Sequence, residues 1–123
     1  MSKGTVLIID DMSTHLLLLQ TILDEEGYTT ITYSNPVEAI KELYKGHINI
    51  MLLDIMMPGM DGFQVLDIIK EDNKISKIPI IVISAKTDSW SIKNALDKGA
   101  FDYITKPINI QDLRNKLKVA LNS

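Results

Sequence analysis

The chain of 123 residues contains no cysteine, so disulfide bonds, zinc ribbons, iron–sulfur clusters and thiol nucleophiles are all excluded. It also lacks long hydrophobic runs: the longest have the length of a β-strand, far short of the roughly 20 residues that span a bilayer. The apolar run after Gly4 is too short for the core of a signal peptide. We therefore expect a soluble, cytoplasmic protein with no membrane insertion.

Glycine is scarce, and the 6 glycines form neither G-x-G-x-x-G nor G-x-x-x-x-G-K-[ST]. Acidic residues follow the first apolar run, where a phosphate-binding loop would offer backbone amides. These absences argue against a nucleotide or flavin binder. The net charge of −3 argues against direct nucleic-acid binding.

Short apolar runs rich in Val and Ile alternate with segments of helical periodicity. The runs predict five strands, at 5–9, 28–33, 49–53, 79–83 and 101–104. The first, third and fourth are nearly continuous in apolar residues, as expected of parallel strands that are covered on both faces. Strands that alternate with helices predict an α/β, doubly wound parallel sheet. No linker interrupts the pattern, so we expect a single domain over residues 1–123.

Several helix ends can be recognised from their residue types. Asn35 followed by Pro36 predicts the start of the second helix, and Asn109 predicts the start of the fifth. Ser13 is a possible cap for the first helix. Trp90 falls at the start of the fourth helix, where we expect it to form part of the core.

Polar residues gather at the predicted carboxyl ends of the strands, where open α/β sheets bind ligands. Asp10 and Asp11 follow the first strand, Asp54 the third, Ser84 the fourth and Lys106 the fifth. Each alone has an ordinary structural explanation, such as a helix cap, a turn or a solvated lysine. Their coincidence on one rim favours a site.

Three close carboxylates repel one another unless a hard cation takes up their charge. Because the rim offers oxygen ligands, Mg²⁺ fits best, and Mn²⁺ is also possible. A cation with open positions, together with Lys and Ser donors, suits a phosphoryl group. A carboxylate can itself act as the nucleophile and form an acyl phosphate.

The sequence resembles the receiver domain of bacterial two-component response regulators, including stand-alone chemotaxis regulators. The blocks that carry this resemblance are VLIIDD at 6–11, LDIMMPGMDG at 53–62, ISA at 83–85 and GAFDYITKP at 99–107. It implies a flavodoxin-like (βα)5 fold with strand order 2-1-3-4-5 and a phosphorylation-activated signalling switch. Such a switch is no turnover enzyme, because it catalyses only its own phosphorylation and slow dephosphorylation.

The resemblance also implies a role for each site residue. Asp54 is the phosphoacceptor, and it binds Mg²⁺ together with Asp11 and the backbone carbonyl of Met56, while Asp10 acts through a metal-bound water. Lys106 and Ser84 contact phosphoryl oxygens. The remaining implied features are the switch pair of Ser84 and Tyr103, and a Lys106–Pro107 peptide that is usually cis.

Met56 and Lys86 match the positions that tune the lifetime of the phosphoryl group in this family. Neither side chain offers a carboxylate or amide to orient an attacking water, so we expect slow to moderate autodephosphorylation. His15 and His47 lack a recognisable ligand constellation and are interpreted as surface residues, although His15 is placed near the acidic rim.

The charge is divided along the chain: residues 1–85 hold 6 basic and 12 acidic side chains, and residues 86–123 hold 7 basic and 4 acidic. The basic part contains the fourth helix, fifth strand and fifth helix, which resemble the output face of the family. We expect this face to meet an acidic partner through Lys93, Lys98, Arg114, Lys116 and Lys118.

The expected phosphodonor is a sensor histidine kinase or a phosphotransfer protein, and the expected target is a downstream protein or a fused output domain. Met1 suggests a natural start, whereas Ser123 falls where a linker would begin, so a stand-alone regulator and part of a longer chain both remain open. A haloacid-dehalogenase-type phosphatase is a competing class, but it needs Asp-x-Asp after the first strand, where this chain has adjacent aspartates. A degenerate, non-phosphorylated adaptor is the third alternative.

Overall fold

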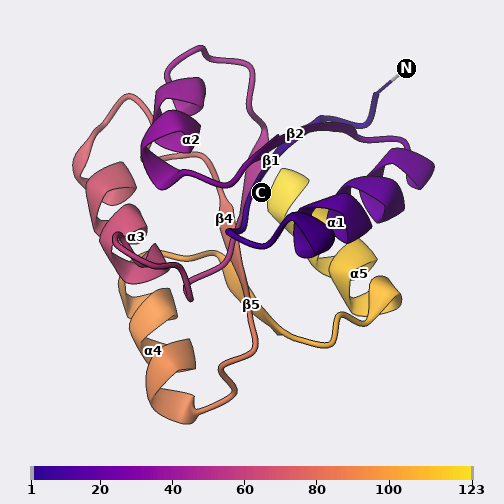
Figure 1. Ribbon diagram of the computed structural model, residues 1–123. Coiled ribbons are helices and arrows are strands. Elements are labelled where there is room, and N and C mark those ends of the chain that lie inside the picture. The colour runs from indigo at the N-terminus through magenta and orange to yellow at the C-terminus, as the bar shows by residue number, and fades with distance from the viewer. Residues whose placement is uncertain (1, 123) are drawn as a thin grey trace.

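The computed structural model describes residues 2–122; Met1 and Ser123, the ends of the expected domain, lie outside the described residues. Five parallel strands form one sheet in the order β2-β1-β3-β4-β5, which confirms the predicted topology (Figure 1). The strand bounds are β1 Thr5–Ile9, β2 Thr29–Tyr33, β3 Ile50–Leu53, β4 Ile80–Ser84 and β5 Asp102–Thr105.

Five helices alternate with the strands, in two layers. Their bounds are α1 Ser13–Glu25, α2 Pro36–Leu43, α3 Gly62–Glu71, α4 Ser89–Asp97 and α5 Ile110–Leu121. Helices α2, α3 and α4 cover one face of the sheet, and α1 and α5 cover the other (Figure 1). The fold is therefore the predicted flavodoxin-like α/β sandwich. No helix within residues 2–122 is long and apolar enough to cross a membrane.

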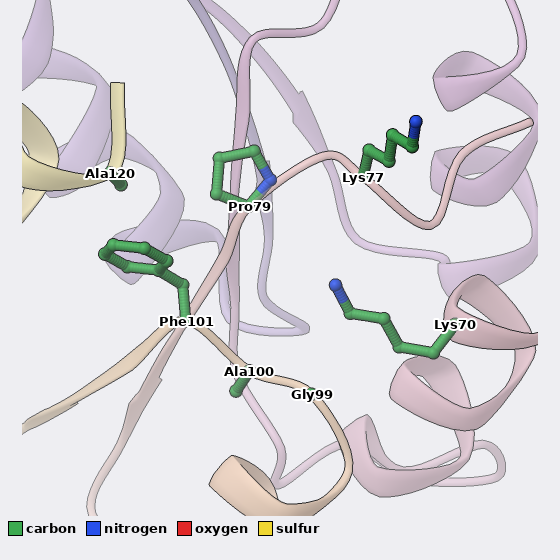
Figure 2. Close-up of a pocket in the computed structure, with 7 residues that line it drawn as sticks. All are labelled: Lys70, Lys77, Pro79, Gly99, Ala100, Phe101 and Ala120. Atoms are coloured by element: carbon green, nitrogen blue, oxygen red, sulfur yellow. The ribbon is translucent and has the colours of Figure 1, made fainter. Parts of the chain in front are cut away.

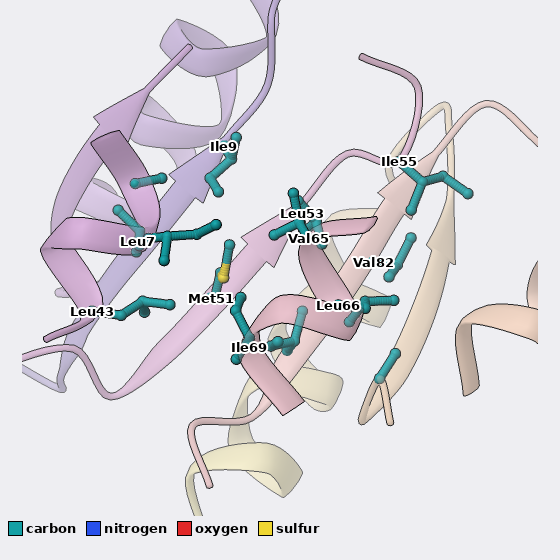
Figure 3. Packing of buried hydrophobic residues seen from close by; sticks show 14 of the residues in the cluster. Leu7, Ile9, Leu43, Met51, Leu53, Ile55, Val65, Leu66, Ile69 and Val82 are labelled. Atoms are coloured by element: carbon teal, nitrogen blue, oxygen red, sulfur yellow. The ribbon is translucent and has the colours of Figure 1, made fainter. Parts of the chain in front are cut away.

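Each face of the sheet has its own apolar core. Beneath α2 and α3, Leu43, Leu66 and Ile69 pack on Leu7 and Met51 of the strands (Figure 3). Beneath α1 and α5, the other face buries a second cluster, which contains Ile8, Leu23, Leu52, Ile81, Leu113 and Leu117. Because β1, β3 and β4 are covered on both sides, their near-continuous apolar sequence is explained.

Side-chain caps fix where most of the helices begin. Asn35 accepts hydrogen bonds from the amides of Val37 and Glu38, and Asn109 accepts one from the amide of Asp112, as the sequence predicts. The prediction of a Ser13 cap is wrong: α1 has Met12 at this position, and no side chain caps it. The Met12 amide donates to the Asp10 carboxylate at 2.9 Å, so the residue that follows β1 provides the acceptor for this backbone N–H group.

Trp90 is also placed differently from the prediction, because its side chain is 66% exposed and not part of the core. Helix α4 buries Ser91 and Ala95, which turns the preceding residue toward solvent. The Trp90 ring meets Phe63 of α3 edge to face, with centroids 5.8 Å apart.

Candidate functional site

Asp10 and Asp54 lie side by side at the carboxyl ends of the central strands. Ile9 pairs with Leu53 in the β1–β3 register, so the two following aspartates are neighbours. Both are buried, with exposed fractions of 1% and 6%. One carboxylate oxygen of Asp54 accepts the Met56 amide at 2.9 Å, which leaves Oδ2 directed at the other charged groups.

Lys106 brings an ammonium to these carboxylates from the loop that follows β5. Its Nζ lies 3.0 Å from Oδ2 of Asp10 and 3.3 Å from Oδ2 of Asp54. The Lys106–Pro107 peptide bond is cis, as the resemblance implies. One ammonium beside two carboxylates leaves the pocket with a net negative charge, which favours a cation or the positive end of a donor group.

The electrostatic surroundings raise the pKa of Asp54 above that of an ordinary aspartate. Burial of the carboxyl is the largest cause, and the nearby Asp10 charge adds to it. The Met56 amide and Lys106 oppose the shift by stabilising the carboxylate. A buried carboxylate with a perturbed pKa beside a charged partner is typical of a functional site.

A second polar group links β4 to β5 at the same end of the sheet. Ser84 is fully buried, and its hydroxyl accepts the Lys86 amide at 3.2 Å. The Tyr103 hydroxyl donates to the Lys86 carbonyl at 2.8 Å. Burial raises the pKa of Tyr103, and the neighbouring Ser84 hydroxyl opposes this effect. The loop after β4 is thus tied to both Ser84 and Tyr103.

The remaining expected site residues lie at the rim of the pocket. Asp11 is exposed, and the cluster of ligand atoms within 4.8 Å of one another is formed by Asp10, His15 and Asp54. The side chain of Met56 is 48% exposed, and Lys86 is exposed as well. The structure therefore does not bring the Asp11 side chain into the cluster that the resemblance implies.

His15 is the residue that the sequence interpretation missed. Its Nδ1 lies 3.1 Å from Oδ2 of Asp10 and 2.8 Å from Nζ of Lys106, so it belongs to the charged cluster. The first turn of a helix that follows β1 faces the strand ends, and this position is the signal from which its place in the cluster could have been predicted. His47, in contrast, is half-exposed and lies 2.8 Å from Glu42, far from this cluster in the fold.

A separate pocket of about 370 Å³ lies at the opposite end of the sheet (Figure 2). Pro79 and Phe101, which line it, directly precede β4 and β5, whereas Ser84 and Lys106 mark the carboxyl ends of the same strands. The pocket is therefore not part of the charged site.

The fold and the carboxyl-end cluster define a class of α/β proteins in which buried aspartates and a lysine meet at the switch point of a parallel sheet. Residues 6–118 match the family model described as the response regulator receiver domain, and the chain belongs to this family. Its members are signalling switches that histidine kinases phosphorylate on an aspartate.

Curated relatives agree with this assignment. The chain is 34% identical over 121 residues to the uncharacterized transcriptional regulatory protein YkoG of Bacillus subtilis, covering 98% of this chain and 52% of that protein. It is 35% identical over 112 residues to the DNA-binding transcriptional regulator NtrC of Escherichia coli, covering 91% of this chain and 24% of that protein. The chain thus spans about half or a quarter of the length of these relatives.

Solved structures show the same fold over nearly the whole chain. A CheY-like receiver domain protein of Methanospirillum hungatei has a TM-score of 0.88 and 28% identity, covering 98% of this chain and 95% of that one. A two-component response regulator of Clostridium difficile has the same TM-score and identity, with 98% and 97% covered.

Proposed function

We propose that Asp54 is the residue that accepts the phosphoryl group. The observation that carries this proposal is a buried carboxylate at the end of β3, held between the Met56 amide and the Lys106 ammonium. An oxygen of Asp54 attacks phosphorus, an aspartyl phosphate bond forms, and the bond from phosphorus to the donor atom breaks. The donor leaves with the electron pair of that bond.

Lys106 and Ser84 act on the phosphoryl oxygens. The ammonium already lies 3.3 Å from Asp54, so it is close to where negative charge develops during transfer. The Ser84 hydroxyl accepts from the Lys86 amide and interacts with Tyr103, and we assign its hydrogen to a phosphoryl oxygen once that group is present.

The donor chemistry of the pocket fits a hard divalent cation. Asp10 and Asp54 present buried carboxylate oxygens near one another, with a net negative charge that a cation offsets. We propose Mg²⁺, with Mn²⁺ as a substitute, held by Asp54, Asp11 and the Met56 carbonyl, and by Asp10 through water. The bound cation supplies charge neutralisation to the phosphoryl oxygens.

The output of the domain is a change in the face formed by α4, β5 and α5. Phosphoryl contacts draw Ser84 toward Asp54, and Tyr103 follows, because both are tied to the Lys86 backbone. Four of the five basic side chains expected on this face are paired: Lys93 with Asp97, Lys98 with Asp67, Arg114 with Glu26 and Lys116 with Asp112. Steering of an acidic partner is therefore weaker than the sequence suggests, since local acids offset these charges.

The phosphodonor is a sensor histidine kinase or a phosphotransfer protein. An apolar groove of about 630 Å³ lies beside Lys106, lined by Leu18, Ile22 and Ile108 among others, and it provides a docking surface next to the nucleophile. We assign the target to a downstream protein or a fused output domain. We assign the domain to the cytoplasm, and we assign to it no direct contact with DNA, although some relatives are named as DNA-binding regulators.

The experiment that tests this function is incubation with acetyl phosphate and Mg²⁺, followed by intact mass. Wild-type protein gains one phosphoryl group, Asp54→Asn gains none, and Asp97→Asn on the surface of α4 behaves as wild type. No gain with acetyl phosphate or with a phosphorylated kinase overturns the proposal. Steady hydrolysis of small phosphomonoesters would instead indicate a turnover phosphatase.

A further inference from the structure

The Lys106 ammonium has three acceptors around it, one for each of its hydrogens. The shortest contact, 2.8 Å, joins Nζ to Nδ1 of His15. The contact to Asp10 is 3.0 Å, and the contact to Asp54 is the longest, at 3.3 Å. His15 and Asp10 therefore hold the ammonium more closely than the nucleophile does.

These contacts favour one tautomer of the His15 ring. If Nδ1 carried a hydrogen, it would donate to Asp10 at 3.1 Å, but it would then point a donor at the Lys106 ammonium. A ring that carries its hydrogen on Nε2 and none on Nδ1 avoids this conflict, because Nδ1 then accepts from Lys106. Asp10 and His15 then share the same ammonium as two acceptors.

Helix α1 keeps the imidazole in place. The His15 amide donates to the Met12 carbonyl at 3.1 Å, and the buried side chains of Leu19 and Leu23 fasten the helix to the sheet. The imidazole is 34% exposed. It contacts Lys106 and also lines the apolar groove of about 630 Å³ beside Lys106.

We propose that His15 is a positioning residue, whose Nδ1 accepts a hydrogen bond from Lys106 and holds the ammonium beside the Asp54 nucleophile. This inference rests on the proposed role of Asp54. Without this acceptor, the ammonium keeps only the carboxylates of Asp10 and Asp54 as partners, and it shifts toward Asp54. The nucleophilic oxygen is then more tightly paired, and the ammonium is displaced from the position where phosphoryl oxygens arrive.

Two substitutions separate the acceptor from the bulk of the side chain. His15→Leu fills similar space without an acceptor, and Leu suits the apolar groove. His15→Asn places Oδ1 on Cγ, where the imidazole carries Nδ1. Leu18→Ala alters the same groove without removing a hydrogen-bond acceptor from Lys106, and it serves as the control.

The readout is the initial rate of phosphorylation by acetyl phosphate with Mg²⁺, alongside urea midpoints that confirm folding. We expect His15→Leu to react about five- to tenfold more slowly than wild type, since small displacements of catalytic groups have large effects. His15→Asn and Leu18→Ala should stay within about twofold of wild type. A wild-type rate for His15→Leu, or an equally slow His15→Asn, overturns the inference.

A spectroscopic measurement tests the contact directly, independently of phosphorylation. Long-range ¹⁵N–¹H spectra of wild-type protein should show His15 protonated at Nε2 and bare at Nδ1, with Nδ1 shifted in Lys106→Met. A protonated Nδ1, or no shift, overturns the inference. Failure of the proposed function looks different: wild-type protein then gains no phosphoryl group, or Asp54→Asn still gains one.

Discussion

Gly62 lies directly against Ile55, at the two ends of the loop that carries the residues after Asp54. A Cβ on Gly62 would come 2.4 Å from Cα of Ile55, and the Gly62 amide donates to the Ile55 carbonyl at 3.1 Å. Since the obstructing atom is backbone, the loop has to move if any side chain is added. This close approach keeps the loop folded over the end of β3.

Gly62→Ala should therefore destabilise the fold and disturb the site together. We expect a loss of about 1–3 kcal/mol in the free energy of unfolding, the usual range for overpacking. Phosphorylation by acetyl phosphate should also slow, because the Met56 amide that contacts Asp54 belongs to the same loop. Urea unfolding and intact mass measure the two effects. Ser89→Ala, at the exposed start of α4, is the control, and equal stability of the two variants would contradict the argument.

Asp54 should reduce the stability of the unphosphorylated, metal-free domain at neutral pH. Burial raises its pKa, so folding favours the protonated form, and the ionised carboxylate is less stable in the fold than in the unfolded chain. Asp54→Asn should then raise the free energy of unfolding at pH 7, because it removes the charge that folding buries.

The sign of the pH dependence follows from the same shift. The favourable contribution of protonated Asp54 is fully present below the pKa of an ordinary aspartate and is lost as pH rises through the raised pKa of the folded state. The increase in the free energy of unfolding caused by Asp54→Asn should accordingly become smaller as the pH is lowered from the raised pKa of the folded state to the pKa of an ordinary aspartate. Urea unfolding with a chelator at several pH values measures it, and a gain that is constant or grows on acidification would count against the prediction.

The fold could be predicted from the sequence because each element carries its own local signal. Buried parallel strands such as β3 and β4 have continuous apolar sequences. Asn35 and Asn109 predict the starts of helices because their side chains cap the first backbone amides. The site could be predicted in part for the same reason: the carboxyl ends of parallel strands share one edge, so Asp10, Asp54 and Lys106 had to meet.

The residues that sequence interpretation placed wrongly depend on contacts between elements. Ser13 is not the cap because the cap position falls one residue earlier, at Met12, whose carbonyl accepts the amides of His15 and Leu16. Trp90 is exposed because α4 is rotated to bury Ser91 and Ala95. His15 joins the charged cluster only when α1 packs beside the loop of Lys106, a contact between residues 91 positions apart in sequence.

Tyr103→Phe should separate phosphorylation from its structural response. The variant loses the hydrogen bond to the Lys86 carbonyl, at a cost of about 0.5–1.5 kcal/mol in the free energy of unfolding, while Asp54 and Lys106 remain unchanged. It should accept a phosphoryl group at nearly the wild-type rate but show smaller shifts in the amide spectrum of the loop after β4. Lys86→Ala keeps the carbonyl and should retain the wild-type response. A full response in Tyr103→Phe would contradict the coupling.

Met56 should give the aspartyl phosphate a long lifetime. Its backbone amide donates to Asp54 at 2.9 Å, and its half-exposed side chain has no carboxylate or amide group to orient an attacking water. Once the donor is removed by rapid desalting, intact mass should show decay over minutes or longer; loss within seconds would contradict this.

Two substitutions at Met56 test the cause of that lifetime while leaving the backbone contact to Asp54 in place. Met56→Asn adds an amide oxygen that can orient water, and decay should accelerate about three- to tenfold, below the 10²–10⁴ of an optimally placed general base. Met56→Leu has similar volume without a polar group and should decay as wild type does. If both substitutions accelerate decay equally, the thioether acts by shielding the bond from water, and orientation of the water is not the controlling factor.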